Sequence, residues 1–153
     1  MIATRYYLTC GIGVAEKELA AFDCSLIDAH VGDFNHVKVS SVLPEKCKRK
    51  DCVQLEKGSI VHTAYANLVS NQENVVLSAC VAVGIPQREG CIGMIMEYSG
   101  TCSVNEAEQI AIDLVKDAMG QRNIEIREIL TAPISAKVPS GCYLSVFSAL
   151  VMW

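Results

Sequence analysis

Two segments of the chain place their apolar residues at the spacing of an α-helix. Residues 15–30 form the first, and Gly32 follows it as a helix stop. Its apolar positions are Leu19, Phe22, Leu26 and Ile27. Residues 103–120 form the second, which opens with the S-x-x-E capping box of Ser103 and Glu106 and closes on a glycine. We therefore expect two amphipathic helices.

The other apolar residues occur in shorter, alternating or β-branched segments that are typical of strands. The glycines of "GIG" at 11–13 are expected to break the first of these. The polar stretch 44–57 is expected to be a loop with a short strand near Val53. The predicted strands are residues 5–9, 34–41, 59–70, 74–85, 91–98, 123–131 and 141–152.

Short linkers join three of these strands in succession. The linker "NQE" connects 59–70 to 74–85, and "PQREG" connects 74–85 to 91–98, so both pairs are expected to form antiparallel hairpins. Helices separated by adjacent strands indicate an α+β fold with mainly antiparallel sheets covered by helices. The length of 153 residues is usual for one domain, so we treat 1–153 as a single domain.

Composition limits the location and the binding partners that are expected for this domain. Apolar residues make up 51% of the chain and the mean hydropathy is +0.29, yet no apolar segment reaches the roughly 18 residues of a membrane span. We infer that some apolar surface is buried against other subunits. The N-terminus lacks the pattern of a secretory signal, so a cytoplasmic location is expected. A net charge of −4 gives no support for nucleic-acid binding.

The eight cysteines are scattered and include no C-x-x-C pair. In a reducing compartment they are expected to be mostly small, buried apolar residues. Cys47 and Cys52 are the one close pair, but no second pair or histidine cluster accompanies them, so no metal site is predicted. The histidines His30, His36 and His62 share no metal-like spacing, and each is expected to be satisfied or exposed.

Four polar features are candidates for chemistry, and each also has an ordinary structural explanation. The adjacent Ser40 and Ser41 close an alternating strand, which suits an edge or a turn. Asp23 suits an exposed position on the first helix, and Asn35 suits a turn. Glu97 ends the apolar strand "GMIMEY", where a carboxylate either reaches solvent or has a role. Taken singly, none of these features is specific.

Taken together, these residues form a specific pattern. The layout "LAAFDCSLIDAHVGDFNHVKVSSVLP", followed by "GSIVHTAYA" and "IGMIMEYSGTCS", resembles the pyruvoyl-dependent arginine decarboxylases from about Leu19 to Glu106. The match includes the serine pair, the asparagine six residues before the second serine, the upstream aspartate and the glutamate of "MEY". The resemblance implies a layered αββα sandwich that assembles as trimers, or as two stacked trimers, with active sites between subunits.

The resemblance also implies that the chain cleaves itself between Ser40 and Ser41. This leaves a β chain of residues 1–40 and an α chain of residues 41–153. Residue 41 would become a covalent pyruvoyl cofactor, and neither PLP nor a metal ion would be used. Asn35 would assist the processing.

For the reaction itself, the resemblance implies L-arginine as substrate and agmatine and CO₂ as products. Glu97 would be the proton donor, and Asp23 would hold the substrate guanidinium. The other substrate-binding residues would be Leu19, Leu26, Gly32, Phe34 and Val42.

The residue types suit this chemistry. The Ser41 hydroxyl can attack the Ser40 carbonyl, and an amide donor such as Asn35 can stabilise the oxyanion by ~3–4 kcal/mol. Elimination across Cα–Cβ of residue 41 and hydrolysis then release ammonia and leave a ketone. This ketone forms an imine with the substrate α-amine and accepts the electrons left by CO₂, as PLP does elsewhere. A carboxyl in an apolar strand, such as Glu97, can protonate the substrate carbon.

Two alternatives remain open at this stage. Phe34 replaces a smaller aliphatic residue of the family pattern, which leaves another basic amino acid possible as the substrate. His62 stands where a proline is common, and it does not touch the proposed chemistry. The second alternative is an uncleaved relative that only binds a guanidinium, but such a protein has no use for the whole set of Asn35, Ser40, Ser41 and Glu97.

Overall fold

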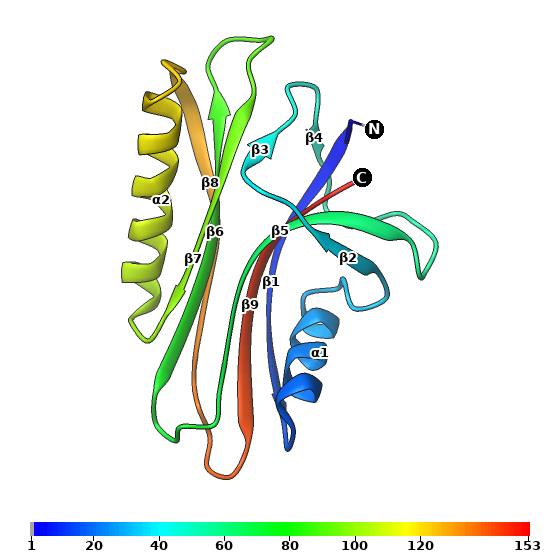
Figure 1. Ribbon diagram of the computed structural model, residues 1–153, viewed down its shortest axis with the longest axis vertical. Coiled ribbons are helices and arrows are strands. Elements are labelled where there is room, and N and C mark those ends of the chain that lie inside the picture. Colours follow the sequence, from blue (N-terminus) through cyan, green and yellow to red (C-terminus); the bar gives the residue numbers. More distant parts are fainter. Residues whose placement is uncertain (1) are drawn as a thin grey trace.

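The computed structural model describes residues 2–153, whose elements are stacked in four layers (Figure 1). Helix α1 covers one face of a five-stranded sheet, a four-stranded sheet packs against the other face, and helix α2 covers the outside of that second sheet. The predicted α+β class is therefore confirmed, with two helices and more residues in strands than in helices among residues 2–153.

Eleven elements follow one another along the described chain. They are β1 (Arg5–Ala15), α1 (Glu18–Asp28), β2 (Asn35–Lys38), β3 (Val42–Leu43), β4 (Lys48–Arg49), β5 (Ile60–Ser70), β6 (Val76–Pro86), β7 (Gly93–Gly100), α2 (Val104–Gly120), β8 (Ile126–Lys137) and β9 (Tyr143–Met152). The five-stranded sheet has the order β2-β5-β9-β1-β4, and the four-stranded sheet has the order β3-β7-β6-β8. The β1–β4 and β2–β5 pairs are parallel, and the other pairs are antiparallel.

One of the two predicted hairpins forms and the other does not. Strands β6 and β7 pair in antiparallel register, as expected. Strands β5 and β6 lie in different sheets, and the antiparallel partner of β5 is β9. The predicted pairing of 59–70 with 74–85 is therefore wrong, because a short linker can also carry the chain between two stacked sheets about 10 Å apart.

The glycines of "GIG" lie inside β1, so the predicted break at 11–13 is wrong. They let α1 approach the sheet closely. A Cβ atom on Gly13 would overlap the carbonyl oxygen of Ala21, and one on Gly11 would overlap that of Ser25. Because residues two apart in a strand face the same way, both glycines open the same face of β1 to the helix.

The face of α1 that packs on β1 is made of small residues. Ala21 and Ser25 are fully buried, whereas Leu19 is 77% and Ile27 is 59% exposed. Large apolar side chains cannot fit where the helix backbone meets the glycines of β1. The apolar spacing in the sequence therefore predicts the helix but not its buried face.

Helix α1 also ends earlier than predicted. His30 takes the left-handed conformation after the last turn, with φ of 60°. The N–H groups of His30 and Val31 donate to the carbonyl oxygens of Ile27 and Leu26, in the pattern of a Schellman motif. Gly32 is thus not the helix stop.

The segment 44–57 contains the short strand β4, which pairs in parallel with the start of β1. The predicted strand near Val53 is wrong. Val53 lies outside any strand, and its half-buried side chain packs in the apolar cluster under α1. Strand β2 covers only part of the predicted strand 34–41, while β1 and β8 run several residues beyond their predicted ends.

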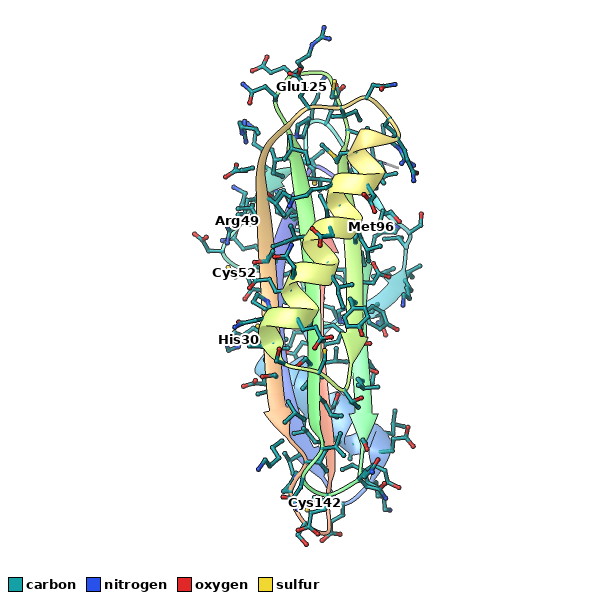
Figure 2. All side chains as sticks on the ribbon, turned by 90° about the vertical axis from the view of Figure 1, so that its left-hand side faces the viewer. His30, Arg49, Cys52, Met96, Glu125 and Cys142 are labelled. Carbon is teal, nitrogen blue, oxygen red and sulfur yellow. The ribbon has the colours of Figure 1, made fainter. Side chains whose placement is uncertain are left out.

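Helix α2 agrees with its prediction. The Ser103 hydroxyl accepts a hydrogen bond from the N–H of Glu106, and the helix ends at Gly120. Figure 2 shows α2 lying along the outer face of β6, β7 and β8. Its buried residues are Ala107, Ala111, Val115, Ala118 and Met119.

The expectation that most cysteines are buried is wrong. Cys80 is buried and Cys52 is exposed, and the other six are partly exposed. The reason is their position, since most of them lie in loops: Cys47, Cys52, Cys91, Cys102 and Cys142. Within residues 2–153, no group of three or more His, Cys, Asp or Glu side chains is arranged to hold a metal ion. Neither helix of this part of the chain is long and apolar enough to cross a membrane.

Candidate active site

The Ser40–Ser41 pair lies where the chain passes from one sheet to the other. It follows β2 of the five-stranded sheet and precedes β3 of the four-stranded sheet (Figure 1). The N–H of Val39 donates to the carbonyl oxygen of Thr63 on β5 at 3.1 Å, and the carbonyl oxygen of Ser41 accepts from the N–H of Ile95 on β7 at 2.7 Å. Backbone hydrogen bonds therefore hold the chain on both sides of the Ser40–Ser41 bond, one to each sheet.

Both serines can be reached from outside the subunit. Ser40 is exposed and Ser41 is half-buried. A hollow of about 230 Å³ beside them is lined by Ser40, Val42 and His62, among others. Val42 is 42% exposed and opposes Met94 in the β3–β7 ladder. Water and a small substrate can therefore approach the serine pair.

Glu97 lies on the same face of β7 as Ile95, the residue that holds Ser41. Ile95 is buried in the cluster between the sheets, so Glu97 also faces the space between them. Its side chain is 29% exposed, and burial raises the pKa of its carboxyl above the ordinary value. The Lys38 ammonium, 3.9 Å from the Glu97 carboxylate, acts in the opposite direction.

Asn35 is not near the serine pair within one subunit. Its Nδ2 donates to the carbonyl oxygen of Gly58 at 2.7 Å, at the start of β2. Ser41 follows six residues later, beyond the other end of that strand. An extended chain rises about 3.3 Å per residue, so six residues span at most roughly 20 Å.

Asp23 and two of its predicted neighbours gather on the outer surface of α1. Leu19, Asp23 and Leu26 line a hollow of about 530 Å³ together with Lys17, Phe22 and Ala20. Asp23 is exposed, and the other side chains that line the hollow are apolar except for that of Lys17. The combination of one carboxylate with apolar walls suits a long cationic side chain.

Gly32 and Phe34 line a separate hollow of about 380 Å³ beyond the end of α1. Its wall includes the ion pair of Lys57 with Asp33, whose atoms are 2.8 Å apart. Phe34 is half-buried and packs in the same apolar cluster as Leu26. One subunit thus brings Ser40, Ser41, Val42 and Glu97 to one region. It places Leu19, Asp23, Leu26, Gly32 and Phe34 along and beyond α1, and Asn35 at the start of β2.

The three histidines differ in their surroundings. Both ring nitrogens of His36 are satisfied, since Nε2 lies 2.9 Å from the Val31 carbonyl oxygen and Nδ1 lies 2.8 Å from the Thr63 hydroxyl. His30 is exposed and His62 is half-buried. Sequence reasoning missed Lys38, whose alternating strand position gave no sign of a contact with Glu97. Its place three residues before Ser41 was the available signal.

Comparison with known proteins gives a consistent result. A model of the pyruvoyl-dependent arginine decarboxylase family matches residues 5–153. A curated relative from Methanocaldococcus jannaschii is 32% identical over 147 residues, which cover 95% of this chain and 87% of the relative. One from Methanopyrus kandleri is 32% identical over 152 residues, covering 99% and 98%. One from Methanothermobacter thermautotrophicus is 32% identical over 130 residues, covering 85% of each chain. All three are named pyruvoyl-dependent arginine decarboxylase. This chain belongs to the pyruvoyl-dependent arginine decarboxylase family.

Proposed function

We propose that this protein is a self-processing decarboxylase that converts L-arginine to agmatine and CO₂ with a pyruvoyl group derived from Ser41. The observation that carries the proposal is the anchoring of the serine pair between the two sheets, through a hydrogen bond from Ser41 to β7, the strand that also bears Glu97. The matching family and the names of the relatives support both the cofactor and the substrate.

Processing begins at the Ser40–Ser41 peptide bond. The Ser41 Oγ attacks the Ser40 carbonyl carbon, the Ser40–Ser41 amide bond breaks, and an ester links the two residues. Elimination then expels the Ser40 carboxylate, and hydrolysis releases the nitrogen of residue 41 as ammonia. The backbone hydrogen bonds at Val39 and at the Ser41 carbonyl oxygen hold the chain on both sides of this bond, which limits the motion of the backbone around it.

The residues around Ser41 fit the group that results. When bound to this chain, the pyruvoyl group supplies a ketone that captures the substrate amine and accepts the electrons released with CO₂. The Ile95 N–H keeps residue 41 on β7 through its amide carbonyl oxygen. Glu97 donates a proton to the substrate carbon, and burial favours this role because it raises the pKa of the carboxyl. No PLP and no metal ion takes part.

Substrate choice rests on the hollow along α1. The Asp23 carboxylate pairs with the guanidinium, for which two parallel hydrogen bonds are available. Leu19 and Leu26 cover the aliphatic part of the substrate. We assign Gly32 and Phe34 to the adjoining wall, and Val42 to the side of the site nearest Ser41.

The α1 residues serve a neighbouring subunit. Asn35 lies at the opposite end of β2 from Ser41 of its own subunit, and its amide donates to the Gly58 carbonyl oxygen. The exposed Leu19 and the apolar hollow beside Asp23 are also surfaces that a second copy would cover. A closed ring of three subunits, or two stacked rings, gives every Ser41 a set of α1 residues from its neighbour.

The decisive experiment is the fate of the purified full-length chain. On a denaturing gel we expect fragments of residues 1–40 and 41–153, the larger lighter than its sequence by one ammonia and blocked at its N-terminus. Turnover is then compared for arginine, lysine and ornithine. A single full-length band under all conditions would overturn self-processing, and lysine as the best substrate would overturn the arginine assignment.

Sharing of the site is tested by mixing two inactive variants. Subunits carrying Asp23→Asn and subunits carrying Glu97→Gln are refolded or coexpressed together in equal amounts. If a site takes Asp23 from one subunit and Glu97 from another, random assembly restores about a quarter of wild-type activity. If both residues act within one subunit, the mixture is as inactive as either variant alone.

A further inference from the structure

A single ion pair joins the two sheets among the ion pairs of residues 2–153. The Lys38 Nζ on β2 lies 3.9 Å from the Glu97 Oε1 on β7. The other ion pairs of this part of the chain join residues of loops or of one element. The pair therefore connects the edge of the five-stranded sheet to the strand that holds Ser41.

The Lys38 ammonium has a second contact that fixes its position. It lies 4.5 Å from the centroid of the Tyr65 ring, within the range of a cation–π interaction. The Tyr65 ring in turn packs against Phe147, with ring centroids 5.5 Å apart. The cation is thus held between an aromatic ring of one sheet and a carboxylate of the other.

Lys38 also stands on the opposite side of the cleavage point from Glu97. It lies three residues before Ser41, in segment 1–40, while Glu97 belongs to segment 41–153. After cleavage the ion pair would join two separate chains, close to the new chain ends. A residue in this position can act on the acid without taking part in the cleavage.

We propose that Lys38 is the positioning residue of Glu97, which aims the carboxyl toward the substrate carbon and sets how readily it gives up and regains its proton. The inference rests on the proposed function, since it takes Glu97 as the proton donor. It adds a residue whose effect on the reaction is electrostatic and acts through Glu97.

Two influences on Glu97 oppose each other. Burial raises the pKa of its carboxyl, and the Lys38 ammonium lowers it. Within residues 2–153, Lys38 is the one charged group that acts on the Glu97 carboxyl. Farther along β7, the Ser99 hydroxyl donates to the Asn67 carbonyl oxygen on β5. Without the ammonium, burial acts alone, so the carboxyl holds its proton to a higher pH.

The first test measures Glu97 directly and needs no turnover. In full-length protein carrying Ser41→Ala, the ¹³C shift of the Glu97 carboxyl carbon is followed against pH, with Glu97→Gln as the assignment standard. Lys38→Met keeps an apolar stem over Tyr65 and removes the charge, and Lys38→Arg keeps the charge. We expect Lys38→Met to move the midpoint to higher pH and Lys38→Arg to move it much less. An unchanged midpoint in Lys38→Met, or equal movement in both variants, would overturn the proposal.

The second test uses the processed enzyme. Lys38→Met should still cleave, and its kcat near neutral pH should fall roughly 10-fold with little change in KM, because the Glu97 carboxyl is no longer aimed at the substrate carbon. The alkaline limb of its kcat–pH profile should move to higher pH.

Lys116→Met removes the lysine of the Lys116–Asp113 pair on α2 and serves as the control, with unchanged kinetics. A rise in KM with unchanged kcat would assign Lys38 to substrate binding instead. If the wild-type chain never cleaves, the proposed function fails while the carboxyl titration still decides the role of Lys38.

Discussion

The backbone N–H of Val81 on β6 donates a hydrogen bond of 2.7 Å to the hydroxyl of Ser148 on β9, so the two sheets are joined through the core. The same hydroxyl donates to the carbonyl oxygen of Ala132 on β8 at 2.7 Å, and Ser148 is fully buried. Val81 is also the register partner of Glu97 in the β6–β7 ladder. The hydroxyl therefore fixes the strand next to the candidate acid.

Ser148→Ala should destabilise the protein by about 2–3 kcal/mol, because it leaves one buried N–H and one buried carbonyl oxygen without this partner. Ser70→Ala is the matched control, since the Ser70 hydroxyl accepts only from an exposed N–H at Gln72. Its effect should stay within about 0.5 kcal/mol. Chemical denaturation at one protein concentration measures both, and equal effects would show that the cross-sheet bond adds nothing.

Gly13→Ala should be strongly destabilising, by roughly 3 kcal/mol or more, because the new methyl group would overlap the backbone of α1 at Ala21. Gly120→Ala has free space for its methyl group at the end of α2 and should be close to neutral. The difference in the free energy of unfolding between the two variants checks the contact. A tolerant Gly13→Ala would mean that α1 does not lie this close to β1.

The sequence allowed the prediction of elements whose signals are local. Helix α2 is an example, because its capping residue Ser103 and its terminal Gly120 lie within the helix segment itself. The sheet assignment of β5 and β6 was not predictable from "NQE", since it depends on β9, which lies far along the chain. The glycines of β1 were wrongly predicted to break the strand for a similar reason. They make room for helix α1, which follows later in the chain, and do not form a turn.

The candidate site, like the fold, was predicted only in part. Ser41 and Glu97 were predicted together, and one chain holds Ser41 beside the strand of Glu97 through the hydrogen bond between Ser41 and Ile95. Asn35 and Asp23 were predicted with them, but one chain places Asn35 at the start of β2 and Asp23 on α1. Lys38 was missed, because both of its contacts lie on other strands, β5 and β7.

Cleavage at Ser40–Ser41 should leave the fold intact. Segment 1–40 supplies β1, which pairs with β9 from Tyr6 to Ala15 within the five-stranded sheet, and β2, which pairs with β5. Removal of this segment would open both the sheet and the core. We expect one species in native size-exclusion chromatography and two bands in a denaturing gel. Separation of the fragments under native conditions would contradict the pairing.

Ser41→Ala should remain a single chain without activity, since it lacks the attacking hydroxyl. Ser40→Ala is the matched control, because it keeps that hydroxyl and the Ser41–Ile95 bond and should still cleave. Intact mass spectrometry after prolonged incubation distinguishes the two. Cleavage of Ser41→Ala at this bond would require a different nucleophile.

Glu97→Gln should cleave normally and decarboxylate poorly, with kcat lowered by about 10²–10³-fold, as expected when a general acid is removed. The amide occupies the same place on β7 but has no acidic proton to give. Fragment formation and CO₂ release are measured on the same preparation. Full activity would remove Glu97 from the role of proton donor.

The same variant makes a prediction for stability against pH. Burial raises the pKa of the Glu97 carboxyl above its ordinary value of 4.5, so the folded protein binds this proton more tightly than the unfolded chain. The contribution of the Glu97 carboxyl to stability is therefore fully present below its ordinary pKa. It is lost as the pH rises through the raised pKa of the folded protein. Glutamine cannot ionise and escapes this loss. Relative to wild type, Glu97→Gln should gain stability as the pH rises above 4.5, with the difference levelling off once Glu97 is ionised. Urea denaturation of both proteins across this range measures the difference. A gap that does not change with pH would mean that Glu97 titrates as an ordinary surface carboxyl.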